Sequence, residues 1–167
     1  DFKMTGFVGG YNGQVGGIKV EVAGKLDFSN AYLTSGETIQ LDAVGITSDA
    51  VSVLKTRGLN IHADRGIGNK ENKLSIQVDT VEAKVGFTGG VYLREADEIV
   101  LSEVISVNGE VDIFAGAELS VDQVEANQVV LESLGHIVEA SPVDSDVDVT
   151  SSEIILRDLD GVITELE

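Results

Sequence analysis

The sequence lacks cysteine, so it can form no disulfide, thiol nucleophile or cysteine metal site. It has one proline, and its aromatic residues amount to 5%, a poor supply of ring faces for stacking sugars. Basic side chains are scarce as well: 11 Lys and Arg stand against 29 Asp and Glu, which gives a formal net charge of -18. This field repels phosphate backbones and excludes nucleic acid as a partner. No apolar run approaches the roughly 18 residues of a membrane helix, so we predict no membrane insertion.

The apolar residues that are present favour strands. The chain contains 24 Val and 13 Ile against 14 Leu, together with 19 Gly. Side chains branched at Cβ are restricted in a helix and pack well on a pleated surface. A hydrophobic content of 43% is too high for a disordered chain. The composition therefore predicts an all-β protein of short strands and tight turns, with almost no helix.

Apolar residues recur as doublets at alternate positions, which is the period of a strand with one buried face. The doublets are Ile18/Val20, Ile39/Leu41, Leu59/Ile61, Val91/Leu93, Val111/Ile113, Val129/Leu131 and Val147/Val149. Successive doublets are 18 to 21 residues apart, except between Leu59 and Val91, where the step is 32. Leu119 and Ile137 repeat the step of 18, and residues 130–138 match residues 155–163 at an offset of 25.

A near-constant step of this length is typical of a solenoid, in which each coil buries its apolar face against the next. Coils that run in one direction at a spacing of about 4.8 Å pair their strands in parallel. We therefore predict a right-handed parallel β-helix of about eight coils of roughly 20 residues, with residues 1–167 forming a single segment. The polar octet 66–73 should be a loop at a corner. An antiparallel sandwich is the alternative, but it requires no constant step.

Charge is distributed unevenly along this segment. Residues 1–84 hold 9 basic and 10 acidic side chains, a net charge of -1. Residues 85–167 hold 2 basic and 19 acidic side chains, a net charge of -17. Because the apolar rhythm continues through this shift, we expect one structure with a neutral half and an acidic half.

Residues 59–140 contain a series of motifs that resembles the repeats of a known protein family. They contain Leu59-Asn60-Ile61-His62-Ala63, then Gly66-Ile67-Gly68, then Leu74, Val78 and Val81-Glu82-Ala83, then Gly89-Gly90-Val91-Tyr92-Leu93. This order is similar to a repeat of filamentous-haemagglutinin-like adhesins, which are large bacterial surface proteins. Val91 and Leu93 replace the usual Ile residues, and residues 111–140 are similar to shorter repeats of the family. The resemblance implies a secreted β-helix at a cell surface that works in adhesion.

Polar motifs give little support to catalysis. His62 alternates with inward Leu59 and Ile61, and His136 lies at a predicted corner, so we expect both to be surface histidines. Gly66-Ile67-Gly68 lacks the third glycine and the helix that a dinucleotide site needs. We predict no catalytic and no cofactor-binding residues.

One acidic stripe is the best candidate for a metal site. Asp144, Asp146 and Asp148 alternate with Val147 and Val149, which places the three carboxylates on one face of an extended strand. Such a face is either simply solvated or able to hold a hard cation such as Ca²⁺.

These observations lead to a structural or adhesive segment of a secreted bacterial surface protein. Its expected partners are a receptor or glycan on a host or neighbouring cell, and neighbouring coils of the same protein. The chain begins without a basic and apolar leader, so we expect any signal peptide to be cleaved or to belong to a longer precursor. The alternatives are a filament that assembles end to end and a carbohydrate-cleaving β-helix enzyme. The enzyme is disfavoured because the chain has only four arginines and one modest loop.

Overall fold

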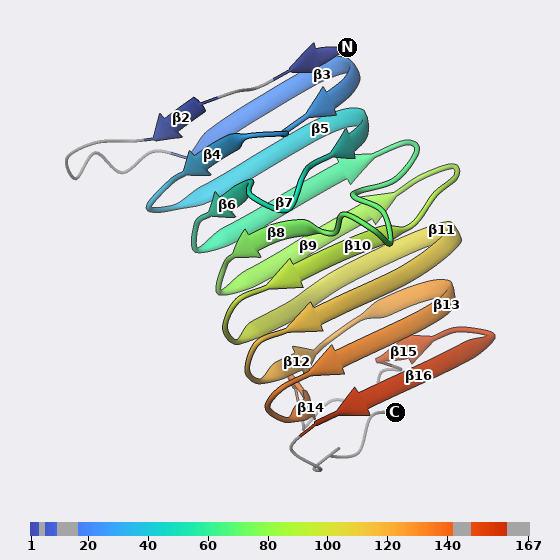
Figure 1. Ribbon diagram of the computed structural model, residues 1–167. Helices are drawn as coiled ribbons and strands as arrows, with labels where there is room; N and C mark the ends of the chain where they lie inside the picture. Colours follow the sequence, from blue (N-terminus) through green and yellow to red (C-terminus); the bar gives the residue numbers. More distant parts are fainter. Residues whose placement is uncertain (4–5, 10–16, 142–147, 160–167) are drawn as a thin grey trace.

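The computed structural model describes residues 1–3, 6–9, 17–141 and 148–159. Within these ranges the chain forms sixteen strands and no helix, and every strand pair is parallel (Figure 1). The predicted all-β parallel β-helix is therefore confirmed. The strands are β1 (Phe2–Lys3), β2 (Gly6–Gly9), β3 (Ile18–Asp27), β4 (Ala31–Thr34), β5 (Thr38–Thr47), β6 (Val53–Lys55), β7 (Gly58–Ala63), β8 (Leu74–Gln77), β9 (Thr80–Val85), β10 (Val91–Glu95), β11 (Ile99–Ala115), β12 (Leu119–Val121), β13 (Val124–Ser133), β14 (Ile137–Glu139), β15 (Val149–Thr150) and β16 (Glu153–Asp158).

Two stacks of strands form the main faces of the solenoid. The first face consists of the first parts of β3 and β5, then β7, β9, the first part of β11, β12 with the start of β13, and β14 with β15. The second face consists of β1 and β2, the ends of β3 and β5 with β4 and β6, then β8, β10, the ends of β11 and β13, and β16. Both stacks run along the length of the molecule (Figure 1).

Alternating side chains from both faces meet in one continuous core. In β7 the inward residues Leu59, Ile61 and Ala63 are buried, while Asn60 and His62 between them are exposed. The same alternation in the other strands joins their inward residues into a single hydrophobic cluster. A single turn could not bury this surface alone, and stacking does so because each turn covers the next.

The predicted steps hold for most register pairs. Ile18 pairs with Ile39, and Ile39 pairs with Leu59. Val91 pairs with Val111, Val111 with Val129, and Leu119 with Ile137. The match at an offset of 25 is also a true register, because β13 residues 129–131 pair with β16 residues 154–156.

Three expectations about the repeat were wrong. Val129 pairs with Ile154, not with Val147, which lies outside the described residues. Leu59 and Val91 belong to different faces: Leu59 pairs with Val81 on the first face. The apparent step of 32 residues compared strands that do not stack. The chain makes about six turns, fewer than the eight expected, because some turns are longer than 20 residues.

Residues 66–73 form the predicted loop, but they lie against the second face. Ile67 is fully buried and bridges Ile46 and Val91. Its neighbours Gly66 and Gly68 have φ angles of 113° and 67°, in the left-handed region that favours glycine. The loop reaches the end of β11 through two ion pairs that its lysines make, Lys70 with Glu110 at 2.8 Å and Lys73 with Asp112 at 2.7 Å.

Candidate functional site

The site lies at the corner where each strand of the second face ends. In the turns nearer the N-terminus, the last strand residues (Thr34, Lys55 and Gln77) point outward or are partly exposed. The amide that follows each strand donates toward the next turn: Ser35 N to Lys55 O at 2.9 Å and Thr56 N to Gln77 O at 3.1 Å.

In the later turns, the backbone amide at the same corner donates to the preceding turn instead of the next one. Gly116 N donates back to Glu95 O at 3.1 Å, Leu134 N to Ala115 O at 3.1 Å, and Leu159 N to Ser133 O at 3.0 Å. These acceptor residues are buried strand ends. Glu95, for example, is the register partner of the inward Ile76, one position before the outward Gln77. Because neighbouring residues of a parallel strand direct their backbone groups to opposite sides, ending a strand one residue earlier reverses the corner hydrogen bond.

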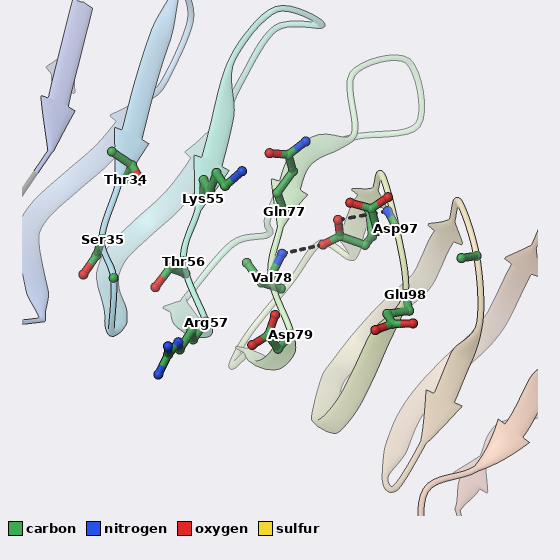
Figure 2. Close-up of a pocket in the computed structure, with 13 residues that line it drawn as sticks. Thr34, Ser35, Lys55, Thr56, Arg57, Gln77, Val78, Asp79, Asp97 and Glu98 are labelled. Carbon is green, nitrogen blue, oxygen red and sulfur yellow. Dashed lines mark hydrogen bonds between the residues drawn. The ribbon is translucent and has the colours of Figure 1, made fainter.

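Glu95 occupies the junction between the two directions. Its side chain is in an inward position, and the residue is only 1% exposed. The carboxylate accepts from the amide of Val78 in the previous turn at 2.8 Å through Oε2 (Figure 2). Its Oε1 accepts from the amides of Ala96 at 2.7 Å and Asp97 at 3.3 Å. The carboxylate therefore supplies acceptors where backbone donors from two turns meet, and unpaired buried amides would be costly.

The environment of Glu95 alters its protonation. Burial raises the pKa of the carboxyl from its usual 4.5 to about 7, because desolvation disfavours the charged form. The hydrogen bonds from the three amides lower the pKa, but by less, and the negative charge of Asp97 raises it slightly. Glu95 thus exchanges its proton close to neutral pH, which is unusual for a carboxyl group.

A surface groove of about 720 Å³ runs along this corner. It extends over five successive turns, represented by Ser35, Thr56, Val78, Asp97 and Ala117. Each turn contributes side chains from its corner segment, so the groove follows the long axis of the solenoid (Figure 2).

Charges are separated along the groove. Lys55 and Arg57 line the part formed by the earlier turns, while Asp97 and Glu98 line the part formed by the later turns (Figure 2). Glu95 lies beneath the part of the groove formed by the later turns, and its carboxylate oxygens already accept hydrogen bonds from backbone amides. The arrangement can hold an extended polar ligand by hydrogen bonds and charge.

Two smaller hollows continue the groove across the second face. The first, of about 110 Å³, shares Gln77 with the groove and is bounded by Ser75 and Arg94. The second, of about 260 Å³, shares Ser75 and Arg94 with the first and is completed by the 66–73 loop through Lys70 and Lys73. The three hollows therefore form a series, and Arg94 lines the two smaller ones.

The acidic stripe is placed only in part. Asp144 and Asp146 lie outside the described residues. Asp148 is 2% exposed, and its neighbour Val149 is also buried, so the expected solvated face does not extend to Asp148. Among the residues that the structure describes, no group of three or more His, Asp or Glu side chains is arranged to hold a metal ion. Calcium binding by the stripe stays a prediction.

The histidines lie where the sequence predicted. The His62 side chain is 59% exposed and its Nδ1 is 3.8 Å from Asp42 Oδ1. The His136 side chain is partly exposed, with Nδ1 4.0 Å from Asp158 Oδ2.

Sequence reasoning missed Glu95. The signal that could have found it is its place in the alternation Val91, Leu93, Glu95, which puts a carboxylate at the third inward position of one strand.

Comparison of the chain with protein-family models, with curated proteins and with solved structures gives no match. In the described ranges, no helix has the length and apolar character needed to cross a bilayer.

Proposed function

We propose that this chain is a structural and adhesive segment of a secreted bacterial surface protein. It would act as a stiff β-helical rod at the cell surface and attach to a receptor or glycan on a host or neighbouring cell. Attachment would come from the side of the rod, where many weak contacts along its length add up.

The observation that carries this proposal is the corner groove on an unbroken solenoid. One hydrophobic cluster runs through the turns, which supports a rigid body. The groove of about 720 Å³ lies along its axis and collects residues from five turns. An extended ligand lying in this groove would contact several turns at once. The resemblance of residues 59–140 to adhesin repeats supports the same function.

Bead attachment tests the proposal. Beads coated with the folded chain should attach to epithelial or bacterial cells in greater number than beads coated with heat-unfolded chain. Equal attachment of both bead types would contradict adhesion. The same protein should be incubated with a panel of polysaccharides, since release of new reducing ends would support the carbohydrate-cleaving alternative.

One observation favours assembly end to end as a second function. Ile18, Val20 and Val22 face inward in β3 but are only partly buried, whereas their register partners Ile39 and Leu41 are fully buried. A further turn stacked on this side would cover them. Sedimentation velocity should then show assemblies that dissociate in the Val20→Lys variant, while the Lys19→Glu variant on the outward side should still assemble. A monomer at all concentrations would contradict this function.

A further inference from the structure

The three hollows of the second face collect a large share of the few basic residues. The chain has only 11 Lys and Arg in total and a net charge of -18. Five of these basic residues line the series of hollows: Lys55, Arg57, Lys70, Lys73 and Arg94. Five acidic residues line the same hollows (Glu71, Asp79, Glu95, Asp97 and Glu98), so what matters for an anion is which basic residue has no carboxylate paired with it.

Arg94 lines both smaller hollows and differs from the lysines beside it. Lys70 and Lys73 are each paired with a carboxylate of β11. Arg94, by contrast, has no carboxylate partner among the described residues, and its guanidinium lies over the ring of Phe114 at 4.9 Å from the centroid. Stacking on a ring holds the guanidinium in place and leaves its edge donors available.

A guanidinium with available donors matches a planar acidic group. It can bind a carboxylate or a sulfate through two parallel hydrogen bonds. The positions around it suit hydroxyl groups, because Asn72, Ser75 and Gln77 offer neutral donors and acceptors on both sides of Arg94. The apolar residues of these two hollows are Ala50, Val53, Ile76 and Ala96. Ile76 is buried in the core, so Val53 and the two alanines are left to give the apolar side chains of a peptide a small anchorage.

We infer that Arg94 and the hollows that flank it bind the acidic groups of a linear saccharide, with the chain of sugars lying along the series of hollows. This inference rests on the proposed adhesive function and names the ligand class of that function. The acidic group is a carboxylate of a uronic acid or a sulfate ester, since both offer the same paired oxygen acceptors.

The test is a calorimetric titration of the full chain with four probes. These are a glucuronate-containing oligosaccharide, a sulfated oligosaccharide, a neutral dextran oligosaccharide and a poly-glutamate peptide. One or both acidic saccharides should bind, and added salt should weaken that binding. The two arms distinguish a carboxylate from a sulfate. Tighter binding of the peptide, equal binding of the neutral saccharide, or no binding of either acidic saccharide would overturn the inference.

Two arginine variants test the residue assignment. Arg94→Gln should weaken binding of the acidic saccharide at least tenfold. Arg157→Gln is the matched control: Arg157 stands further along the same outward column, through the register pairs Arg94 with Phe114, Phe114 with Glu132 and Glu132 with Arg157. Its guanidinium already contacts Glu132 at 3.4 Å, so binding should not change. Equal losses in both variants would overturn the assignment.

Both arginines are exposed, so folding can be verified by an unchanged circular dichroism melt. Bead attachment separates the two levels of the argument. If beads attach to cells but acidic saccharides do not bind, the inference fails and the adhesive function stands. If the beads do not attach, the function itself fails.

Discussion

Replacing Glu95 with glutamine should change how the stability of the protein depends on pH. In the folded chain the carboxyl has a pKa of about 7, whereas in the unfolded chain it returns to about 4.5. The folded state therefore keeps this proton when the unfolded state has lost it. Stability from this group is fully present below about pH 4.5, falls as the pH rises from 4.5 to 7, and stays constant above that.

The magnitude follows from the difference between the two pKa values. The pKa of Glu95 is about 2.5 higher in the folded chain than in the unfolded chain, which corresponds to at most about 3 kcal/mol of stability at 1.36 kcal/mol for each pKa unit. The Glu95→Gln variant has no ionisable group at this position and cannot show the change. Relative to this variant, the wild-type free energy of unfolding should therefore fall by up to about 3 kcal/mol between about pH 4 and about pH 8.

Urea unfolding followed by far-ultraviolet circular dichroism gives the measurement. The whole chain gains negative charge as the pH rises, so the comparison needs a variant that also removes one charge from the groove. Glu98→Gln serves this purpose, because Glu98 lines the same groove and is exposed. Its pH profile should run parallel to that of the wild type. If the profiles of wild type and Glu95→Gln are parallel too, the assigned role of the buried carboxyl is refuted.

Two further predictions concern backbone contact and the loop. A Cβ added to Gly109 would clash with the carbonyl oxygen of Gly89, so Gly109→Ala should lower the free energy of unfolding in urea by more than about 2 kcal/mol. Gly36→Ala, with nothing within 4 Å of the added Cβ, should change it by less than about 1 kcal/mol. Equal effects of the two substitutions would contradict the close approach of the turns. Lys73→Met should lower the free energy of unfolding by about 1 kcal/mol, because the ion pair that Lys73 makes with Asp112 is largely shielded from solvent. The loss should be larger at low salt than at high salt, since salt screens the ion pair. Lys70→Met should have a smaller effect, since that lysine is 59% exposed, and a larger loss for Lys70 would contradict the argument.

The register of the solenoid could be predicted from the sequence because burial enforces it. A strand with one buried face must keep its Val, Ile and Leu residues at alternate positions. Stacking then places Ile39 over Ile18 and Val129 over Val111, as the structure confirms. The expected stacking of the Val147/Val149 doublet on Val129 failed for a physical reason as well: Val149 pairs with Val124 on the first face, whereas Val129 lies on the second. The doublet pattern identifies strands with an inward face, but it does not identify which of two faces they belong to.

The corner site could not be predicted in the same way. The alternation Val91, Leu93, Glu95 places Glu95 inward only if the strand extends through residue 95, and a glutamate normally argues against a buried strand position. Whether a corner amide meets a carbonyl or another amide depends on a shift of a single residue between neighbouring turns. Asp148 also departs from the alternation: it is 2% exposed although its neighbour Val149 is buried as well.

The side-chain acceptor at Glu95 has a consequence for engineering the length of the protein. A designer who duplicates a turn on either side of this residue joins backbone edges that already match. Strand pairs on both sides of Glu95 are parallel and keep one register, so a copied turn presents the same backbone edges as its original. Only the step at Glu95 needs a side chain as well, because its carboxylate accepts from the amide of Val78, so a turn inserted between these two residues must bring a carboxylate of its own.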